Sequence, residues 1–200
     1  MLIIIMMFLA YRISKEYIDK IENKRTSFHF QYFIPANINI IISYYGLNDY
    51  KINISSILVF LICIILIVIE IVDRRTMIIP NVLLVFLLII VCIYTLIERD
   101  VYMYQRIIGI FIISIPMVII NEWFIESFGG GDIKLLMIMG YLLGFIEVML
   151  VMVIAILLGG LSVSWRMFLK KEKLQAYIPF APYLCTGIII VIFYGKNIIS

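Results

Sequence analysis

Long apolar runs, separated by short polar stretches, dominate the chain. Six runs are candidates for helices that cross a lipid bilayer: Ile57–Val72, Val82–Ile97, Ile107–Ile120, Ile133–Phe145, Val148–Val163 and Tyr183–Tyr194. A crossing helix needs about 20 mostly apolar residues, so flanking aromatic and polar residues must complete the shorter runs. Because backbone polar groups must be satisfied internally in lipid, the pattern predicts an all-α fold, a polytopic transmembrane helix bundle of about seven or eight helices.

The N-terminal part follows this pattern less well. Met1–Ala10 is apolar but too short for a full span, and it lacks the basic start and cleavage site of a removable signal peptide. Phe28–Gly46 carries Pro35, Asn37 and Asn39, which makes it a poor span. We therefore expect a divergent N-terminal segment over residues 1–53, with a short apolar helix, a basic loop and a weak second span, followed by a membrane-embedded domain over residues 54–200.

Composition excludes several classes of protein. The 200 residues are 64% hydrophobic and 14% charged, and the mean hydropathy is +1.14. A soluble domain is about 45–50% apolar and about 25% charged, so an ordinary soluble globule and a disordered chain are excluded. Cys63, Cys92 and Cys185 stand singly in apolar runs, and His29 is the one histidine. This indicates neither a disulfide framework nor a metal site.

The distribution of charge predicts the orientation in the membrane. The net charge of +3 is too small to indicate a nucleic-acid partner. Most Lys and Arg residues lie in Arg12–Arg25, at Arg74–Arg75 and Lys134, and in Arg166–Lys173. Basic residues concentrate on the cytoplasmic side, so we expect these stretches there. An even number of crossings must then separate the first two stretches. Either Phe28–Gly46 crosses weakly, or it lies in the interface and the charge rule is broken.

Two aspartates border the apolar runs. Asp73 ends one run and Asp132 begins another, and the predicted orientation places both at the cytoplasmic face. A carboxylate at the edge of hydrocarbon is costly and indicates a functional site by default. The structural alternative is interfacial anchoring, with Arg74, Arg75 or Lys134 as the partner.

Two glycine patterns accompany these residues. Gly129–Gly131 directly precede Asp132, and glycines at a helix start fit a sharp turn or the close approach of another backbone, such as an extended peptide substrate. A phosphate loop would lack its GxxxxGK[ST] spacing, and Asp132 would repel the phosphate. A plain N-cap role for Asp132 is the structural alternative. Further on, Gly140 and Gly144 form GxxxG, which favours close helix packing.

Two carboxyls held close together cannot both ionise easily, so they share a proton. The ionised partner can take a proton from water, while the protonated one can donate to a scissile carbonyl. This is the chemistry of aspartic proteases, and the chain contains no GxSxG or HExxH pattern that would favour another hydrolase. Glu70 lies three residues before Asp73 on the same helix face. It is a candidate third acid, a partner of an Arg, or a residue facing a wet groove.

Three segments of the chain resemble the type IV prepilin peptidases, which are GxGD-type intramembrane aspartic proteases related to the archaeal preflagellin peptidases. The segments are Asp73 to Asn81 (DRRTMIIPN), Gly129 to Leu135 (GGGDIKL) and Ile178 to Tyr183 (IPFAPY). The resemblance implies cleavage of leaders from prepilins and pseudopilins at the cytoplasmic face of the bacterial cell membrane. It implies that Asp73 and Asp132 are the catalytic pair. The matching loop positions are Gly129, Gly130, Gly131, Lys134 and Pro80.

The N-terminal part departs from this family. Many bacterial members carry an insert with two CxxC pairs and methylate the new N-terminus with S-adenosylmethionine. Residues 1–53 contain no cysteine, so we expect no zinc-bound insert and no cofactor, unless a methyltransferase activity that uses S-adenosylmethionine is retained. The short apolar length before Phe8 suggests a truncated or wrongly assigned start. The oligomeric state stays open, and so do two rival functions: a transporter or channel with Asp73 and Asp132 as ion ligands, and a catalytically silent scaffold.

Overall fold

The computed structural model describes Arg12, Lys15, Glu16, Tyr45 and residues 39–43, 53–98, 100–123, 128–170 and 179–199. Residues 166–170, 196, 197 and 199 are described by their backbone alone. Six long helices lie within these residues: α3 (Ile54–Thr76), α4 (Asn81–Ile97), α5 (Met103–Trp123), α6 (Gly130–Leu143), α7 (Phe145–Lys170) and α8 (Ala181–Ile199). Asn39–Ser43 are helical as well. The described residues contain no strand, which confirms the all-α fold.

Each of the six helices contains one predicted apolar run and continues beyond it at one or both ends. The exception is α6, which ends two residues before its predicted run does. Three helical stretches are long and apolar enough to cross a membrane: α3, α5 and Phe145–Trp165 of α7. Asn81–Ile97 and Ala181–Gly195 are shorter apolar helices. By length and composition this is a helical membrane protein. Met1–Ala10 and most of Phe28–Gly46 lie outside the described residues, so the helix count and the division after residue 53 stay predictions.

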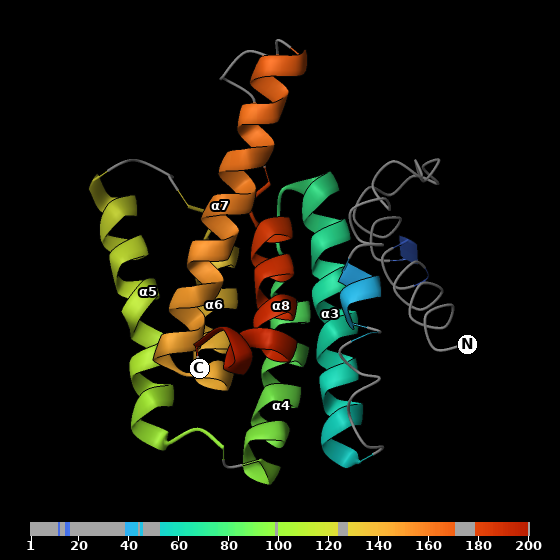
Figure 1. The fold of residues 1–200 in the computed structure, drawn as a ribbon, viewed down its shortest axis with the longest axis vertical. Coiled ribbons are helices and arrows are strands. Elements are labelled where there is room, and N and C mark those ends of the chain that lie inside the picture. Colours follow the sequence, from blue (N-terminus) through green and yellow to red (C-terminus); the bar gives the residue numbers. More distant parts are fainter. Residues whose placement is uncertain are drawn as a thin grey trace.

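The helices run alternately up and down, so their ends meet in two groups (Figure 1). One end of the bundle holds the last residue of α3, Thr76, and the first residues of α4, α6 and α8, namely Asn81, Gly130 and Ala181. We call this end the aspartate end, because Asp73 and Asp132 both lie there. The upper part of α7 extends beyond the other helices on the same side (Figure 1).

α3 is the most deeply buried of the three candidate spans. This helix packs against α4 and α8, α4 also contacts α6, and α8 also contacts α6 and α7. α3 is apolar around most of its circumference and mostly buried, whereas α5 and α7 expose apolar side chains such as Phe111 and Leu157. An all-round apolar helix belongs in the interior, while exposed apolar faces suit helices whose solvent is lipid.

The closest helix contact joins α5 to α6 through glycines. A Cβ atom added to Gly140 would collide with the backbone carbonyl of Gly109, and the reverse holds as well. Gly144 ends α6 at a φ of 95°, a conformation that L side chains rarely adopt. The close packing predicted for Gly140 is therefore confirmed. Gly144 lies close to Gly109 too, but its φ adds a second need for glycine, the turn into α7.

Arg106 closes the opposite end of the bundle. Its guanidinium is buried and donates to four backbone carbonyls: Val101 and Glu98 in the loop between α4 and α5, and Tyr141 and Leu142 at the end of α6. A cation at a helix C-terminus satisfies carbonyls that have no partner inside the helix. The residue therefore anchors the α4–α5 loop to the end of α6.

The glycine contact predicts a specific loss of stability. Gly140→Ala adds a methyl group where the Gly109 backbone already lies, so we expect a cost of about 1–3 kcal/mol and a lower Tm in detergent. Gly160→Ala is the matched control, because a Cβ at this helical position would meet no atom within 4 Å. Thermal unfolding of both purified variants checks this expectation. Equal melting of the two would contradict the contact.

Candidate active site

Asp73 lies in the last turns of α3 and is 5% exposed. The helix ends at Met77, which adopts a left-handed conformation with a φ of 53° and donates its N–H to the Asp73 carbonyl at 2.8 Å. Arg74 and Arg75 occupy the last turn, where cations interact favourably with the helix dipole. The end of α3 therefore places a buried acid beside two basic residues.

Asp132 lies in the first turn of α6 and is 8% exposed. The N-cap of this helix is Gly129, and the backbone N–H of Asp132 donates to the Gly129 carbonyl at 3.0 Å. The N-cap interpretation of Asp132 is therefore wrong, since the residue stands three positions inside the helix. A carboxylate in the first turn is still stabilised by the helix dipole.

The three glycines before Asp132 differ in their surroundings. A Cβ on Gly131 would lie 2.7 Å from the Cβ of Ile79, and one on Gly129 would lie 3.1 Å from Oδ2 of Asp132, whereas Gly130 has no neighbour within 4 Å. Gly144 is the one described glycine with a positive φ. The glycines are thus not required by a left-handed turn. The close neighbour of Gly131 is the Ile79 side chain of the same chain, and the expected approach of a substrate backbone stays a prediction.

A polar contact joins the first two segments. Lys134 is exposed, and its Nζ donates to Oδ1 of Asn81 at 2.9 Å. Pro80 precedes Asn81 as the N-cap of α4, with a φ of −67°. Together with the Ile79–Gly131 contact, this hydrogen bond fixes the start of α4 against the start of α6.

The third segment contacts the first segment and the residue that precedes the second. The backbone of Ala181, the first residue of α8, hydrogen-bonds to the Asp73 carboxylate. Phe180 packs against Phe128, just before the glycines, with ring centroids 6.3 Å apart. Ile178 lies outside the described residues. The first segment therefore contacts the other two, and Phe128 connects the third segment to the start of the second.

The two carboxyls interact through their charges. Asp73 acts electrostatically on Asp132, and both act on Cys185 of α8. Oδ2 of Asp73 and Oδ1 of Asp132 are buried without a hydrogen-bond partner among the described residues. Buried polar atoms are nearly always satisfied in folded proteins, so two such oxygens at one end of the bundle are unusual. They are acceptors left available for a proton, a water or a substrate group.

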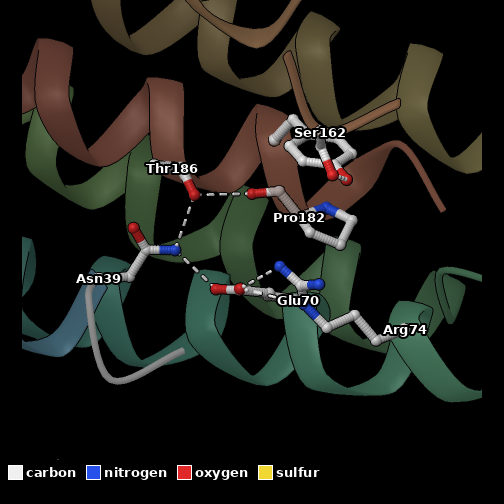
Figure 2. A network of polar contacts seen from close by, with 7 residues as sticks. Asn39, Glu70, Arg74, Ser162, Pro182 and Thr186 are labelled. Atoms are coloured by element: carbon white, nitrogen blue, oxygen red, sulfur yellow. Dashed lines mark hydrogen bonds and ion pairs between the residues drawn. The ribbon is translucent and has the colours of Figure 1, made fainter. Parts of the chain in front are cut away.

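Glu70 completes the acidic residues of this region. Its side chain is fully buried and forms an ion pair with Arg74 at 3.1 Å. Figure 2 shows the carboxylate between the Arg74 guanidinium and the Asn39 amide. Pairing with an Arg is therefore confirmed, and exposure to a wet groove is wrong. Since Arg74 pairs with Glu70 and Lys134 donates to Asn81, both cations have partners other than the two aspartates.

Sequence reasoning missed three amide and hydroxyl residues. Asn121 donates to the Phe128 carbonyl at 2.9 Å and accepts from its N–H at 2.8 Å, which ties the end of α5 to the glycine loop. Asn39 and Thr186 connect Glu70 to α8. The available signal was polarity alone, since an Asn or Thr within an apolar membrane segment needs a partner inside the bundle.

The chain was compared with known proteins. The model of the type IV leader peptidase family matches residues 60–164. The prepilin leader peptidase/N-methyltransferase of Bacillus subtilis (strain 168) is 29% identical over 135 residues, which cover 68% of this chain and 54% of that relative. The chain thus spans about half the length of the curated relative. No solved structure matches the chain. Since the matched region covers more than half of the chain and includes both aspartates, the protein belongs to the type IV leader peptidase family.

Proposed function

We propose that this protein is a membrane endopeptidase that removes leaders from type IV prepilin-like and pseudopilin-like proteins, using water activated between Asp73 and Asp132. One observation carries the proposal: three segments hold two buried carboxyls that interact electrostatically, each with one unpartnered oxygen. Family membership supports peptidase activity. The name of the Bacillus subtilis relative supports a prepilin leader as the substrate.

The proposed reaction uses both aspartates as acid and base. The ionised carboxylate takes a proton from water as the water oxygen attacks the scissile carbonyl carbon. The protonated partner donates to the carbonyl oxygen, and the tetrahedral intermediate then releases the amine with a proton from the pair. Each aspartate must therefore both gain and lose a proton in a cycle. The free oxygens of Asp73 and Asp132 suit this exchange.

We propose that the aspartate end faces the cytoplasm of a bacterial cell. Arg74, Arg75 and Lys134 lie at this end, and the extended upper part of α7 contains the positions of Arg166 and Lys170. Lys and Arg concentrate on the cytoplasmic side of membrane proteins. A prepilin whose leader stays in the cytoplasm would then meet both carboxyls directly.

The proposal covers peptide cleavage only. The aspartate pair needs no cofactor, because both the acid and the base are side chains of this chain. The name of the relative also includes an N-methyltransferase activity. This activity, which would need S-adenosylmethionine, stays outside the proposal, because residues 1–53 contain none of the cysteines of the family's insert.

We expect Asp73→Asn and Asp132→Asn each to lower cleavage by about 10²-fold or more, since an amide cannot exchange the proton. The assay co-expresses a tagged prepilin, whose basic leader ends in Gly, and follows its change in size. Asp100→Asn is the matched control, because Asp100 lies in the loop at the opposite end of the bundle.

The proposed catalytic pair is supported if the wild-type protein and the Asp100→Asn control cut the prepilin while both aspartate variants do not. If a variant cuts at the wild-type rate, the substituted aspartate is not catalytic. A wild-type protein that is folded but cuts none of several prepilins would favour the scaffold or transport interpretation.

The glycine loop predicts a graded effect. In Gly131→Ala the new methyl group would displace Ile79 or the start of α6, and with it Asp132. We therefore expect cleavage to fall by about tenfold, because small displacements of a catalytic group slow a reaction. Gly130→Ala is the matched control, since a Cβ there has open space. Initial cleavage rates at equal protein level test the difference. Equal rates for the two variants would mean that the Ile79 contact does not position Asp132.

A further inference from the structure

Glu70 is a buried acid that the proposed reaction does not use. It lies one helical turn before Asp73 on α3, and its side chain has no solvent exposure. Burying a charged carboxylate is costly unless partners satisfy it. Both oxygens have such partners: Oε1 accepts from Nε of Arg74 at 3.3 Å and from Nη2 at 3.1 Å, and Oε2 accepts from the Asn39 amide at 2.6 Å.

The pairing of Arg74 is a choice between two acids. Arg74 directly follows Asp73 in the chain and is close enough to act on its carboxyl electrostatically. Its guanidinium pairs with Glu70, four residues earlier on the same face of the helix, which is the favoured spacing for an ion pair within a helix (Figure 2). An Arg–carboxylate pair is commonly bidentate and occupies both carboxylate oxygens. A pair between Arg74 and Asp73 would therefore engage the oxygen that is now free.

The other oxygen of Glu70 leads to α8. The Asn39 amide that donates to Glu70 also donates to Oγ1 of Thr186 at 3.0 Å, and this hydroxyl donates to the Pro182 carbonyl at 2.8 Å (Figure 2). Pro182 follows Ala181, whose backbone hydrogen-bonds to Asp73. Glu70 thus ties α3 to α8 at a second point, one turn below the Asp73–Ala181 contact.

We propose that Glu70 is a positioning residue that holds the Arg74 guanidinium and the Asn39 amide, so that Asp73 keeps one carboxyl oxygen free for the proton it shares with Asp132. The proposal rests on the proposed function for its catalytic consequence. Its geometric content is independent of that function: without the Glu70 charge, Arg74 pairs with Asp73. A cation paired to a carboxylate favours the charged form and opposes the proton exchange that the reaction needs.

The ionisable groups around Asp73 come from three helices. Glu70 and Arg74 lie on α3 with Asp73, and Asp132 lies on α6. Cys185 on α8 is within electrostatic reach of Asp73 and of these three groups. Arg74 is the cation that acts on the Asp73 carboxyl, while Arg75 lies in the same last turn of α3 and Lys134 donates to Asn81. A change in the position of Arg74 is therefore the main way in which a Glu70 variant can alter the proton equilibrium of Asp73.

Cleavage in a double-mutant cycle tests the catalytic part. We expect Glu70→Gln to lower kcat by about tenfold with little change in KM, and to move the acidic limb of the pH–rate profile to lower pH. Adding Arg74→Gln removes the cation that would pair with Asp73. We therefore expect the double variant to recover most of the lost rate and the wild-type position of the acidic limb.

A purely structural role gives the opposite result. If Glu70 only stabilised the fold, the second substitution would leave the rate equal or lower, and the acidic limb would stay in place in both variants. That outcome overturns the proposal. Asp73→Asn, run in parallel, fails to cut if the aspartate pair is correct, so a failure of the proposed function is recognised separately.

A stability cycle tests the geometric part without any substrate. In the wild-type background we expect Asp73→Asn to change the Tm little, because within the described part of the chain Asp73 forms no ion pair. In the Glu70→Gln background Arg74 pairs with Asp73, so the same substitution should lower the Tm clearly, and the two effects should not add. If the Tm effects are not additive but the protein does not cut, the Arg74–Asp73 pairing is supported and only its role in cleavage is overturned. Additive effects overturn the pairing itself.

Discussion

The burial of three carboxyls at one end of an apolar helix bundle is the constraint on which the rest of the structure depends. Glu70, Asp73 and Asp132 are each at most 8% exposed. Removing a charged group from water costs several kcal/mol unless protein groups replace the lost hydration. Glu70 obtains these groups from Arg74 and Asn39, and Asp73 obtains one from the start of α8. Because these partners come from different parts of the chain, solvating the acids also fixes how the helices meet.

Lipid gives helices little hydrophobic reason to associate, so close packing must take over that role. The contact between Gly109 and Gly140 brings α5 against α6, and the contact between Gly131 and Ile79 brings the start of α6 against the segment after α3. Both contacts depend on the absence of a single methyl group. The position of Asp132 therefore depends on small residues as much as on polar ones.

The two ends of the bundle treat buried polar groups differently. At the far end, Arg106 donates to four backbone carbonyls and serves as an anchor. At the aspartate end, Asp73 and Asp132 each keep one buried oxygen without a partner in the described part of the chain. A stabilising role alone would favour complete satisfaction of these groups. The unequal treatment is what an active site needs, and it agrees with membership of a leader peptidase family.

The sequence by itself determined the elements and their order. Hydropathy located all six helices, although α7 and α8 continue well past their predicted ends. The alternation of the helices placed Asp73 and Asp132 at the same end, because an even number of crossings separates them. The apolar length of a run and the position of a charge are local properties that can be read directly from the sequence. The resemblance of three short segments to a known family was also visible without a structure.

Only the tertiary structure decided which polar groups from distant parts of the chain become partners. Asn39 reaches Glu70 across 31 positions and Thr186 across 147. Ala181 at the start of α8 reaches Asp73 near the end of α3, and Lys134 of α6 donates to Asn81 of α4. These outcomes depend on the rotation and depth of helices that pack against one another. No local pattern encodes that geometry, because residues far apart in the chain set it jointly.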